Sequence, residues 1–297
     1  MKGRFKLVWL LATAVVLAVA MLAAGCGGDD DEDGGGGGES ARQYPADTTM
    51  GKLQKAGEIK IGVKYDVPPF GVKNPQSGDI EGFDVDIGKV IAKELGVKPR
   101  FVEAVSDNRV PFLQKGSVDL VLSTMTITAE RDQEIDFSEP YYTARGRVLV
   151  PKGSDIKGIQ DLGGKKVCTA RGSTYEETLK EEVPSADLRL VDAYSECFEL
   201  LQNKGVDAVS TDDVILTGMI IQDDNLEMVG KGFTTEPYGA GVKDGDKEFQ
   251  KFVSGVIADV KGDERWGEAY QKWVGQYTKQ KQEPPTMTLQ QALDLSK

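Results

Sequence analysis

The sequence contains no histidine in 297 residues and only three cysteines. Without histidine, the chain cannot form a Ser-His-Asp or Cys-His catalytic site, and it lacks the commonest zinc ligand. Positive charge is also scarce, since the chain has 36 lysines and arginines but 48 aspartates and glutamates. The formal charge is -12. Three cations precede residue 7 and six acids lie between residues 29 and 39, so residues 40–297 carry -9. This balance excludes the basic surface of a typical nucleic-acid-binding protein.

A long apolar run occurs at the N-terminus. Residues 7–24 carry no charge and follow three cations in residues 1–6, which is the order of a secretory signal peptide. An uncleaved membrane anchor is the alternative, because 18 apolar residues are near the short limit of a bilayer span. The end of the run, LAAGC, resembles the bacterial lipobox, whose cysteine receives a diacylglyceryl group before cleavage. We therefore predict a signal peptide over residues 1–25 and lipidation of Cys26, which would hold the exported protein on the outer face of the bacterial cytoplasmic membrane.

Residues 26–49 begin with the string CGGDDDEDGGGGGE. The acids repel one another and the glycines have no side chain to bury, so we expect a flexible tether. An EF-hand calcium loop would need alternating ligands and a closing glutamate, which this string lacks. We therefore expect no metal and no cofactor.

Strand-like and helix-like patterns alternate along the rest of the chain. Residues 58–64 (EIKIGVK) alternate like a strand, and residues 83–95 place apolar residues at helical spacing before Gly96. From residue 157 a second series follows, with the strings KKVCTA, STYEETLKEE, DLRLVDA, YSECFELLQNKG and VDAVST. Strands that alternate with helices predict βαβ units and a parallel sheet, here two sheets in tandem.

Six strings occur in a recognisable order: GVKYDVPPF, GFDVDI, NRVPFLQKGSVDLVLSTMTITAERDQEIDFSEPYY, GSTYEE, GVDAVSTDD and YGAGVK. In this order and spacing they resemble the polar-amino-acid-binding subgroup of ABC-transporter solute-binding proteins, over about residues 50–275. The resemblance implies an α/β, two-lobed, periplasmic-binding-protein-like fold of type II (Venus flytrap), in which each lobe is a sheet flanked by helices and two segments form the hinge.

The same resemblance implies a division of the chain and a set of partners. The predicted parts are lobe 1 (residues 50–146 and 243–276), lobe 2 (147–242) and a C-terminal extension (277–297), with chain crossings near 145–150 and 238–243. The expected partners are a free amino acid and an ABC permease with its ATPase. We expect a monomer that binds no nucleic acid and is not an enzyme. A cyclohexadienyl-dehydratase-like enzyme and a sensory binding protein, which share the resembled fold, are the alternatives.

A free amino acid is a zwitterion, so its site must supply donors for the carboxylate and an acceptor for the ammonium. Thr124 and Thr126 stand two apart at the end of a predicted strand and are expected to face the same way. Arg131 follows, and an arginine fork can bind a carboxylate bidentately. In the resembled family the arginine that matches Arg131 binds the α-carboxylate, with help from groups that match Thr126 and Thr174. A surface ion pair of Arg131 with Glu134 or Asp136 is the alternative.

The string GST lies between a predicted strand and a predicted helix. The unpaired N–H groups at such a helix start attract anions, which makes Ser173 and Thr174 candidate ligand-binding residues. A simple Ser/Thr helix cap is the other interpretation. Asp212, at the carboxyl end of a predicted strand, matches the residue that binds the amino group in the resembled family. Open α/β sheets bind ligands at this end of their strands.

The prediction of the ligand depends on Lys64 and Arg109. Family members that bind aspartate or glutamate carry an arginine that matches Arg109 in a similar N-R-[VI]-P string, and some carry a matching lysine. Thr124, Tyr194 and Tyr238 match further side-chain contacts. The resemblance therefore implies glutamate or aspartate as the ligand, with glutamine or another polar amino acid as the alternative. Pairing of Arg109 with Asp107, and a solvated Lys64, would remove this argument.

Once Cys26 is lipidated, two cysteines remain, Cys168 and Cys197. An even number of cysteines in an exported protein is compatible with a disulfide. Bacterial glutamate-binding members of the resembled family carry a similar pair, which implies a disulfide. Two free buried thiols are the alternative.

Overall fold

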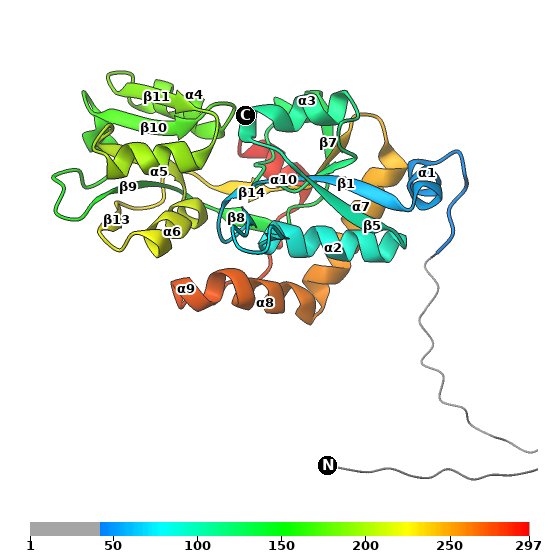
Figure 1. Ribbon diagram of the computed structural model, residues 1–297. Coiled ribbons are helices and arrows are strands. Elements are labelled where there is room, and N and C mark those ends of the chain that lie inside the picture. The colour runs from blue at the N-terminus through cyan, green and yellow to red at the C-terminus, as the bar shows by residue number, and fades with distance from the viewer. Residues whose placement is uncertain (1–41, 297) are drawn as a thin grey trace, which may run out of the picture. The chain divides into compact units, whose positions relative to one another are not determined.

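Two five-stranded sheets organise the residues that the computed structural model describes, residues 42–296 (Figure 1). The first sheet has the order β5-β1-β6-β15-β7 and the second the order β11-β10-β12-β9-β13. The predicted signal peptide, Cys26 and the tether as far as residue 41 lie outside the described residues.

The first sheet is the centre of lobe 1. Its strands are β1 (Glu58–Val63), β5 (Lys98–Glu103), β6 (Leu120–Val121), β7 (Ile135–Phe137) and β15 (Gly241–Lys243). The helices α1 (Thr49–Ala56), α2 (Phe83–Leu95), α3 (Arg109–Gln114) and α7 (Lys247–Gly262) pack on it, and α8 (Glu264–Tyr270) packs on α2 and α7. Helix α2 ends at Gly96, whose φ of 77° and backbone N–H bonds to the last turn make it a left-handed helix cap.

The second sheet is the centre of lobe 2. Its strands are β9 (Gly146–Pro151), β10 (Lys166–Ala170), β11 (Asp187–Val191), β12 (Ala208–Asp212) and β13 (Leu226–Val229). The helices α4 (Thr174–Glu182), α5 (Tyr194–Gln202) and α6 (Asp213–Gln222) cover it (Figure 1).

Both sheets are mixed, so the predicted parallel pairing holds for three strands of each sheet and is wrong for the rest. Strands β5, β1 and β6 are parallel, as are β11, β10 and β12, but β15 and β9 pair antiparallel with their neighbours. Strands β15 and β9 follow the chain segments that link the two sheets, without a crossover helix of the kind that makes neighbouring strands parallel.

A two-stranded antiparallel sheet connects the two lobes. It pairs β8 (Tyr142–Ala144) with β14 (Glu236–Tyr238), and Figure 1 shows both between the larger sheets. Tyr142 packs on Tyr238 and on Phe70, with ring centroids 5.7 and 4.9 Å apart. Trp266 of α8 donates from its indole nitrogen to the Tyr141 carbonyl at 2.7 Å. The predicted fold class is therefore confirmed, with two sheet-and-helix lobes and two connecting segments.

Shorter elements complete the described chain. They are β2 (Asp66–Val67), β3 (Gly71–Lys73), β4 (Ile80–Glu81), the 3-10 helices at Ser106–Asn108, Arg131–Gln133 and Ile159–Leu162, the π-helical turn Gln271–Gly275, α9 (Gln276–Thr278) and α10 (Leu289–Asp294). The C-terminal helix α10 lies on lobe 1, where Ala292 is buried with Leu113 and Phe137. Within residues 42–296, every helix is too short or too polar to cross a bilayer.

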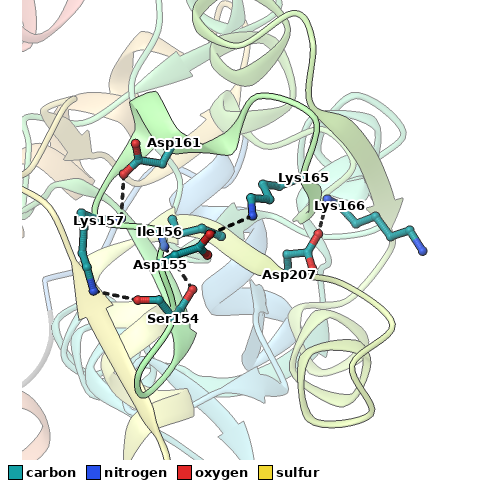
Figure 2. Close-up of polar contacts among 8 residues, drawn as sticks. All are labelled: Ser154, Asp155, Ile156, Lys157, Asp161, Lys165, Lys166 and Asp207. Atoms are coloured by element: carbon teal, nitrogen blue, oxygen red, sulfur yellow. Dashed lines mark hydrogen bonds and ion pairs between the residues drawn. The ribbon is translucent and has the colours of Figure 1, made fainter.

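In each lobe, an aspartate side chain links two parallel strands near their amino ends by a hydrogen bond to a backbone N–H. In lobe 1 the Asp119 carboxylate accepts from the Lys60 N–H at 2.8 Å, and in lobe 2 the Asp207 carboxylate accepts from the Lys166 N–H at 2.7 Å (Figure 2). The two aspartates occur in the related strings KGSVDLV and KGVDAV. Fixed at these ends, the strands present their carboxyl ends to the opposite lobe.

The structure joins Cys168 and Cys197 by a disulfide, with their Cα atoms 5.5 Å apart. The bond links β10 to α5 inside lobe 2, so the two cysteines are not free thiols. A closed loop with a sequence separation of 29 residues restricts the unfolded chain, which stabilises lobe 2 by about 3 to 4 kcal/mol.

Candidate functional site

Lys64 lies at the end of β1, buried between the lobes. Its ammonium donates to the Ser106 hydroxyl at 2.7 Å and lies 5.8 Å from the centre of the Tyr194 ring in lobe 2. Burial, followed by the nearby Arg109, lowers the pKa of Lys64 well below its usual value. The alternative of a solvated Lys64 is therefore wrong.

Arg109 is also buried, at the start of α3. Its guanidinium donates to four backbone carbonyls: Ser106 at 3.0 Å, Ser123 at 3.1 Å, Thr124 at 2.9 Å and, across the gap between lobes, Gly172 at 3.2 Å. Burial, followed by Arg131, lowers the pKa of Arg109 to about 9, which leaves it a cation at pH 7. Because four carbonyls accept from its guanidinium, Arg109 does not pair with Asp107 and has few N–H groups left for a ligand, although the neutral carbonyls leave its positive charge in place.

Arg131 lies in the 3-10 helix that follows Thr126. It donates to the Thr126 carbonyl at 2.7 Å and to the Gly172 carbonyl at 3.0 Å. The alternative ion pair with Glu134 or Asp136 is wrong, since Asp136 instead pairs with a lysine of α7. The guanidiniums of Arg109 and Arg131, both in lobe 1, therefore donate to the same carbonyl oxygen of lobe 2, that of Gly172.

Thr124 does not continue the alternation of a strand. Strand β6 ends at Val121, and Thr124 has a φ of 44°, in the left-handed region. The Asp84 carboxylate holds it there by accepting the Thr124 N–H at 2.8 Å. The expectation that Thr124 and Thr126 face the same way as strand neighbours was therefore wrong. This backbone conformation directs the Thr124 carbonyl at Arg109.

Asp84 is a buried acid that the sequence reasoning missed. The Tyr141 hydroxyl donates to it at 2.8 Å, and burial raises the pKa of Asp84 to about 7 against the opposing effect of the Thr124 N–H. A signal was available, because residue 84 falls on the apolar face of α2, in line with Ile87 and Ile91. An acid on such a face needs a specific partner.

Ser173 and Thr174 lie at the start of α4, but Ser173 makes no capping hydrogen bond. Its hydroxyl instead lies 3.4 Å from the Thr169 hydroxyl. The simple capping interpretation is wrong for Ser173, and the first N–H groups of α4 keep their anion-binding capacity. The turn before them depends on Gly172, whose φ is 68° and whose N–H donates to Glu176 at 3.0 Å.

Asp212 ends β12 on the side of lobe 2 that faces lobe 1. The Tyr175 hydroxyl donates to it at 2.8 Å. Burial, followed by repulsion from Glu236, raises the pKa of Asp212 well above its usual value. The Thr211 and Tyr238 hydroxyls are buried nearby, and neither makes a hydrogen bond of good geometry with another described residue. Tyr194, whose pKa burial raises to about 12, is neutral at pH 7.

Glu236 is the second buried acid that the sequence reasoning missed. It begins β14, and one of its carboxylate oxygens accepts from the Thr126 hydroxyl at 2.7 Å and from the Thr174 hydroxyl at 3.0 Å. The available signal was an acid in the string TTEPYG, directly before the predicted chain crossing at residue 238. Glu236 connects the two threonines that the resemblance had assigned to carboxylate binding.

The two lobes are in direct contact around these groups. Asp66 of lobe 1 accepts from the Ser195 N–H at the start of α5, at 2.9 Å. A Cβ atom on Gly218 of α6 would lie 1.7 Å from the Pro68 carbonyl oxygen. A cavity of about 30 Å³ remains beside these contacts, lined from both lobes by residues that include Asp66, Tyr194 and Gly218. All ten sequence-predicted ligand residues border this lobe interface or contact a residue that does.

The carboxylates of the interface outnumber its cations by one. The cations are Lys64, Arg109 and Arg131, and the carboxylates are Asp66, Asp84, Asp212 and Glu236; five of the seven are buried, and Arg131 and Asp66 are partly buried. Burial favours the neutral forms of Lys64, Asp84 and Asp212 alike, and without these three charges two cations, Arg109 and Arg131, and two carboxylates, Asp66 and Glu236, remain.

Comparison with known proteins places this geometry in a family. The sequence profile of the bacterial extracellular solute-binding proteins, family 3, matches residues 59–276. The ABC transporter glutamine-binding protein GlnH of Bacillus subtilis (strain 168) is 41% identical over 273 residues, which cover 91% of this chain and 97% of that protein. The glutamine-binding protein of Geobacillus stearothermophilus is 36% identical, with 83% and 96% covered. The structure of an ancestral arginine-binding protein bound to glutamine is 38% identical, with a TM-score of 0.71 and with 74% of this chain and 98% of that chain covered. The chain belongs to the bacterial extracellular solute-binding proteins of family 3.

Proposed function

We propose that this protein is the extracytoplasmic amino-acid-binding component of an ABC importer and that its ligand is glutamine. A fork of donors on Arg131 in lobe 1 and the Asp212 carboxylate in lobe 2 complement the two charges of an amino acid backbone. The Thr211 and Tyr238 hydroxyls beside Asp212 supply further polar contacts. This complete clamp favours binding and release of an intact zwitterion over a dehydratase-like reaction.

The charge count at the interface is the observation that carries the choice of glutamine, because four carboxylates already accompany its three cations. Glutamine has no net charge, so its binding leaves this count unchanged. Glutamate would bring one uncompensated negative charge into a buried site. The predicted preference for glutamate or aspartate assumed that both Lys64 and Arg109 await a counter-charge, whereas four carbonyls already accept from Arg109.

Lys64 gives this site a donor for the side-chain amide. An ammonium has three protons, and one of them is used by the Ser106 hydroxyl. A remaining proton can bind the amide oxygen of glutamine, with Thr124, Tyr194 and Tyr238 as side-chain neighbours. The positive charges of Lys64 and Arg109 oppose the side chain of a bound arginine or lysine.

Glutamate is the second candidate, and Lys64 is the observation that favours it. Within hydrogen-bond distance, the described partner of its ammonium is the neutral Ser106 hydroxyl. A ligand carboxylate placed there would gain an ion pair. The charge count of the whole interface weighs against this gain, because Asp212 and Glu236 repel an added negative charge.

For the place of the protein in the cell, we propose a lipid anchor on Cys26. The support is the LAAGC string and the tether that follows it in the sequence. Replacement of Cys26 by alanine should release the protein into the medium or leave the precursor unprocessed. A variant that stays on the membrane at the mature size would contradict lipidation.

The amino acid that co-purifies with the protein tests the ligand assignment. The protein is isolated without denaturant and then precipitated, and the released amino acids are identified by mass spectrometry. We expect glutamine in excess over glutamate and arginine. Release of glutamate as the main amino acid, without glutamine, would overturn the proposal. The Asp212→Asn variant, prepared in parallel, should carry none.

A further inference from the structure

Glu236 stands between the two lobes and contacts both. One carboxylate oxygen accepts from Thr126 of lobe 1 at 2.7 Å and from Thr174 of lobe 2 at 3.0 Å. The residue is 3% exposed, so the carboxylate has exchanged most of its water for these two hydroxyls. Hydrogen bonds to a charged, desolvated acceptor are stronger than those between neutral groups.

The backbone of Glu236 is linked to lobe 1 through the end of its strand. Strand β14 is paired with β8, and Thr126 forms an isolated bridge with Tyr238, the last residue of β14. Tyr238 in turn packs on Phe70, with ring centroids 5.8 Å apart. On the other side, the Thr234 hydroxyl accepts from the Gly146 N–H of lobe 2 at 3.1 Å. The bridge holds Glu236 beside Thr126, and the side-chain bond from Glu236 to lobe 2 is the one to Thr174.

Thr174 is the first residue of α4 and follows a short loop of lobe 2 that contacts lobe 1. The loop comprises residues 171–173, between β10 and α4. Its Gly172 carbonyl accepts from both Arg109 and Arg131. A Cβ atom on Gly172 would lie 2.7 Å from the Cα of Asp107, which shows how closely the loop fits. The loop thus contacts two side chains and one stretch of backbone of lobe 1, and Thr174 adds the bond to Glu236.

Thr126 and Thr174 could bind either Glu236 or the carboxylate of the ligand, and the number of hydroxyl protons distinguishes these two roles. Each hydroxyl has a single proton, and Glu236 accepts both protons at once. Neither proton is then available to the carboxylate of an amino acid. In the closed arrangement, binding of that carboxylate falls to Arg131 and to backbone N–H groups at the start of α4.

We propose that Glu236 is a positioning residue that latches lobe 2 onto lobe 1 through the Thr174 hydroxyl, so that the protein samples the closed state without a ligand. The latch consists of groups of the protein alone. It holds whichever amino acid binds, and the hydrogen-exchange test needs no ligand; only the dissociation measurement rests on the proposed ligand, glutamine.

Hydrogen exchange of the full-length chain in detergent, measured by mass spectrometry without amino acid, tests the latch. Glu236→Gln leaves a neutral, weaker acceptor, and Thr174→Val removes the donor with little change of shape. Each should speed amide exchange at residues 171–176 roughly tenfold, and the double variant should add little to either. Thr174→Ser restores the hydroxyl and should restore the protection. Glu182→Gln, the same change at an exposed site of α4, is the matched control.

Two results would overturn the latch. One is unchanged exchange at residues 171–176 in both single variants. The other is tighter amino-acid binding by Glu236→Gln, which would mean that Glu236 competes with the ligand carboxylate for the threonines. The latch instead predicts faster ligand dissociation, by a factor of roughly five to ten, in stopped-flow measurements with glutamine. Thr174→Ser should dissociate at the unmodified rate.

Discussion

Arg131 and Asp212 face each other from different lobes, and each supplies what one end of a zwitterion needs. The variants Arg131→Lys and Asp212→Asn keep the size of the side chain but remove the fork or the charge. Asp212→Asn leaves the ligand ammonium unpaired at a buried site, at a cost of about 3 to 5 kcal/mol, whereas Arg131→Lys keeps a cation but loses the bidentate fork. We expect titration calorimetry to show at least a hundredfold weaker binding.

The stability of Asp212→Asn distinguishes loss of a contact from loss of the fold. Burial raises the pKa of Asp212 well above its usual value, which means that the fold disfavours its charge. The asparagine variant should therefore unfold at the same temperature as the unmodified protein or at a higher one. Near-normal affinity in either variant would move the binding site elsewhere.

Asp84 should give the protein a measurable pH dependence of stability. Its folded pKa of about 7 exceeds the ordinary value of 3.8, so from about pH 4 to pH 7 the folded state retains a proton that the unfolded state has released. The contribution of Asp84 to stability therefore falls as the pH rises through this window, by up to about 4 kcal/mol. Tyr141 donates to the carboxylate, and Lys64 and Arg109 are its nearby charges.

Asp84→Asn is the variant that isolates this effect, since asparagine can still accept the Thr124 N–H and never ionises. In urea unfolding experiments, the stability of the variant relative to the unmodified protein should increase between pH 4 and pH 8. A difference that is constant across this range would show that Asp84 does not titrate there.

Individual residues also show where sequence reasoning ends. The cations Lys64, Arg109 and Arg131 could be assigned to the lobe interface by resemblance, and the structure brings all three there. Their partners could not be predicted, because carbonyl groups are identical along the chain and a sequence does not say which ones converge. Because four carbonyls already accept from Arg109, we propose a neutral amino acid as the ligand instead of the acidic one that the sequence predicted.

At the scale of elements, helix α6 and the turn at Pro68 fit so closely that Gly218 has no room for a side chain. A Cβ atom there would lie 1.7 Å from the Pro68 carbonyl oxygen of the other lobe. Gly218→Ala should hold the lobes apart and weaken glutamine binding at least tenfold, with no loss of stability in the ligand-free protein, because alanine favours a helix. Calorimetry and thermal unfolding check both parts.

Gly255→Ala in α7 is the matched control for this substitution, since no atom outside its own helix lies within 4 Å of the added Cβ position. It should leave the affinity unchanged. Equal affinity in Gly218→Ala and Gly255→Ala would mean that α6 and Pro68 do not approach each other in the liganded protein.

Many of the longer elements could be predicted from periodicity and glycine stops, which are local signals. The pattern over residues 83–95 and the stop at Gly96 correspond to α2 and its cap. Pairing direction is not local. The antiparallel strands β9 and β15 depend on how the chain crosses between lobes, and β13 (Leu226–Val229) was missed because a four-residue strand carries too few positions to show a period.

On the scale of the whole molecule, the contact between the two lobes brings together charged side chains that come from both of them. Lobe 1 brings Lys64, Arg109, Arg131, Asp66 and Asp84, lobe 2 brings Asp212, and Glu236 lies on the strand between them. Sequence composition reports a net charge of -12 but not its distribution. The gathering of three cations with four carboxylates follows from the fold, because the carboxyl ends of the parallel strands of both sheets meet there.

Calorimetric titration of the ligand-free protein with glutamine and glutamate at pH 7 tests the central claim most directly. Because glutamate adds a negative charge to an interface whose carboxylates already outnumber its cations, we expect glutamine to bind roughly a hundredfold more tightly. Arginine should give no measurable heat. Equal or tighter binding of glutamate, with weaker binding of glutamate after Lys64→Gln, would contradict the account and establish Lys64 as a free counter-charge for an acidic ligand.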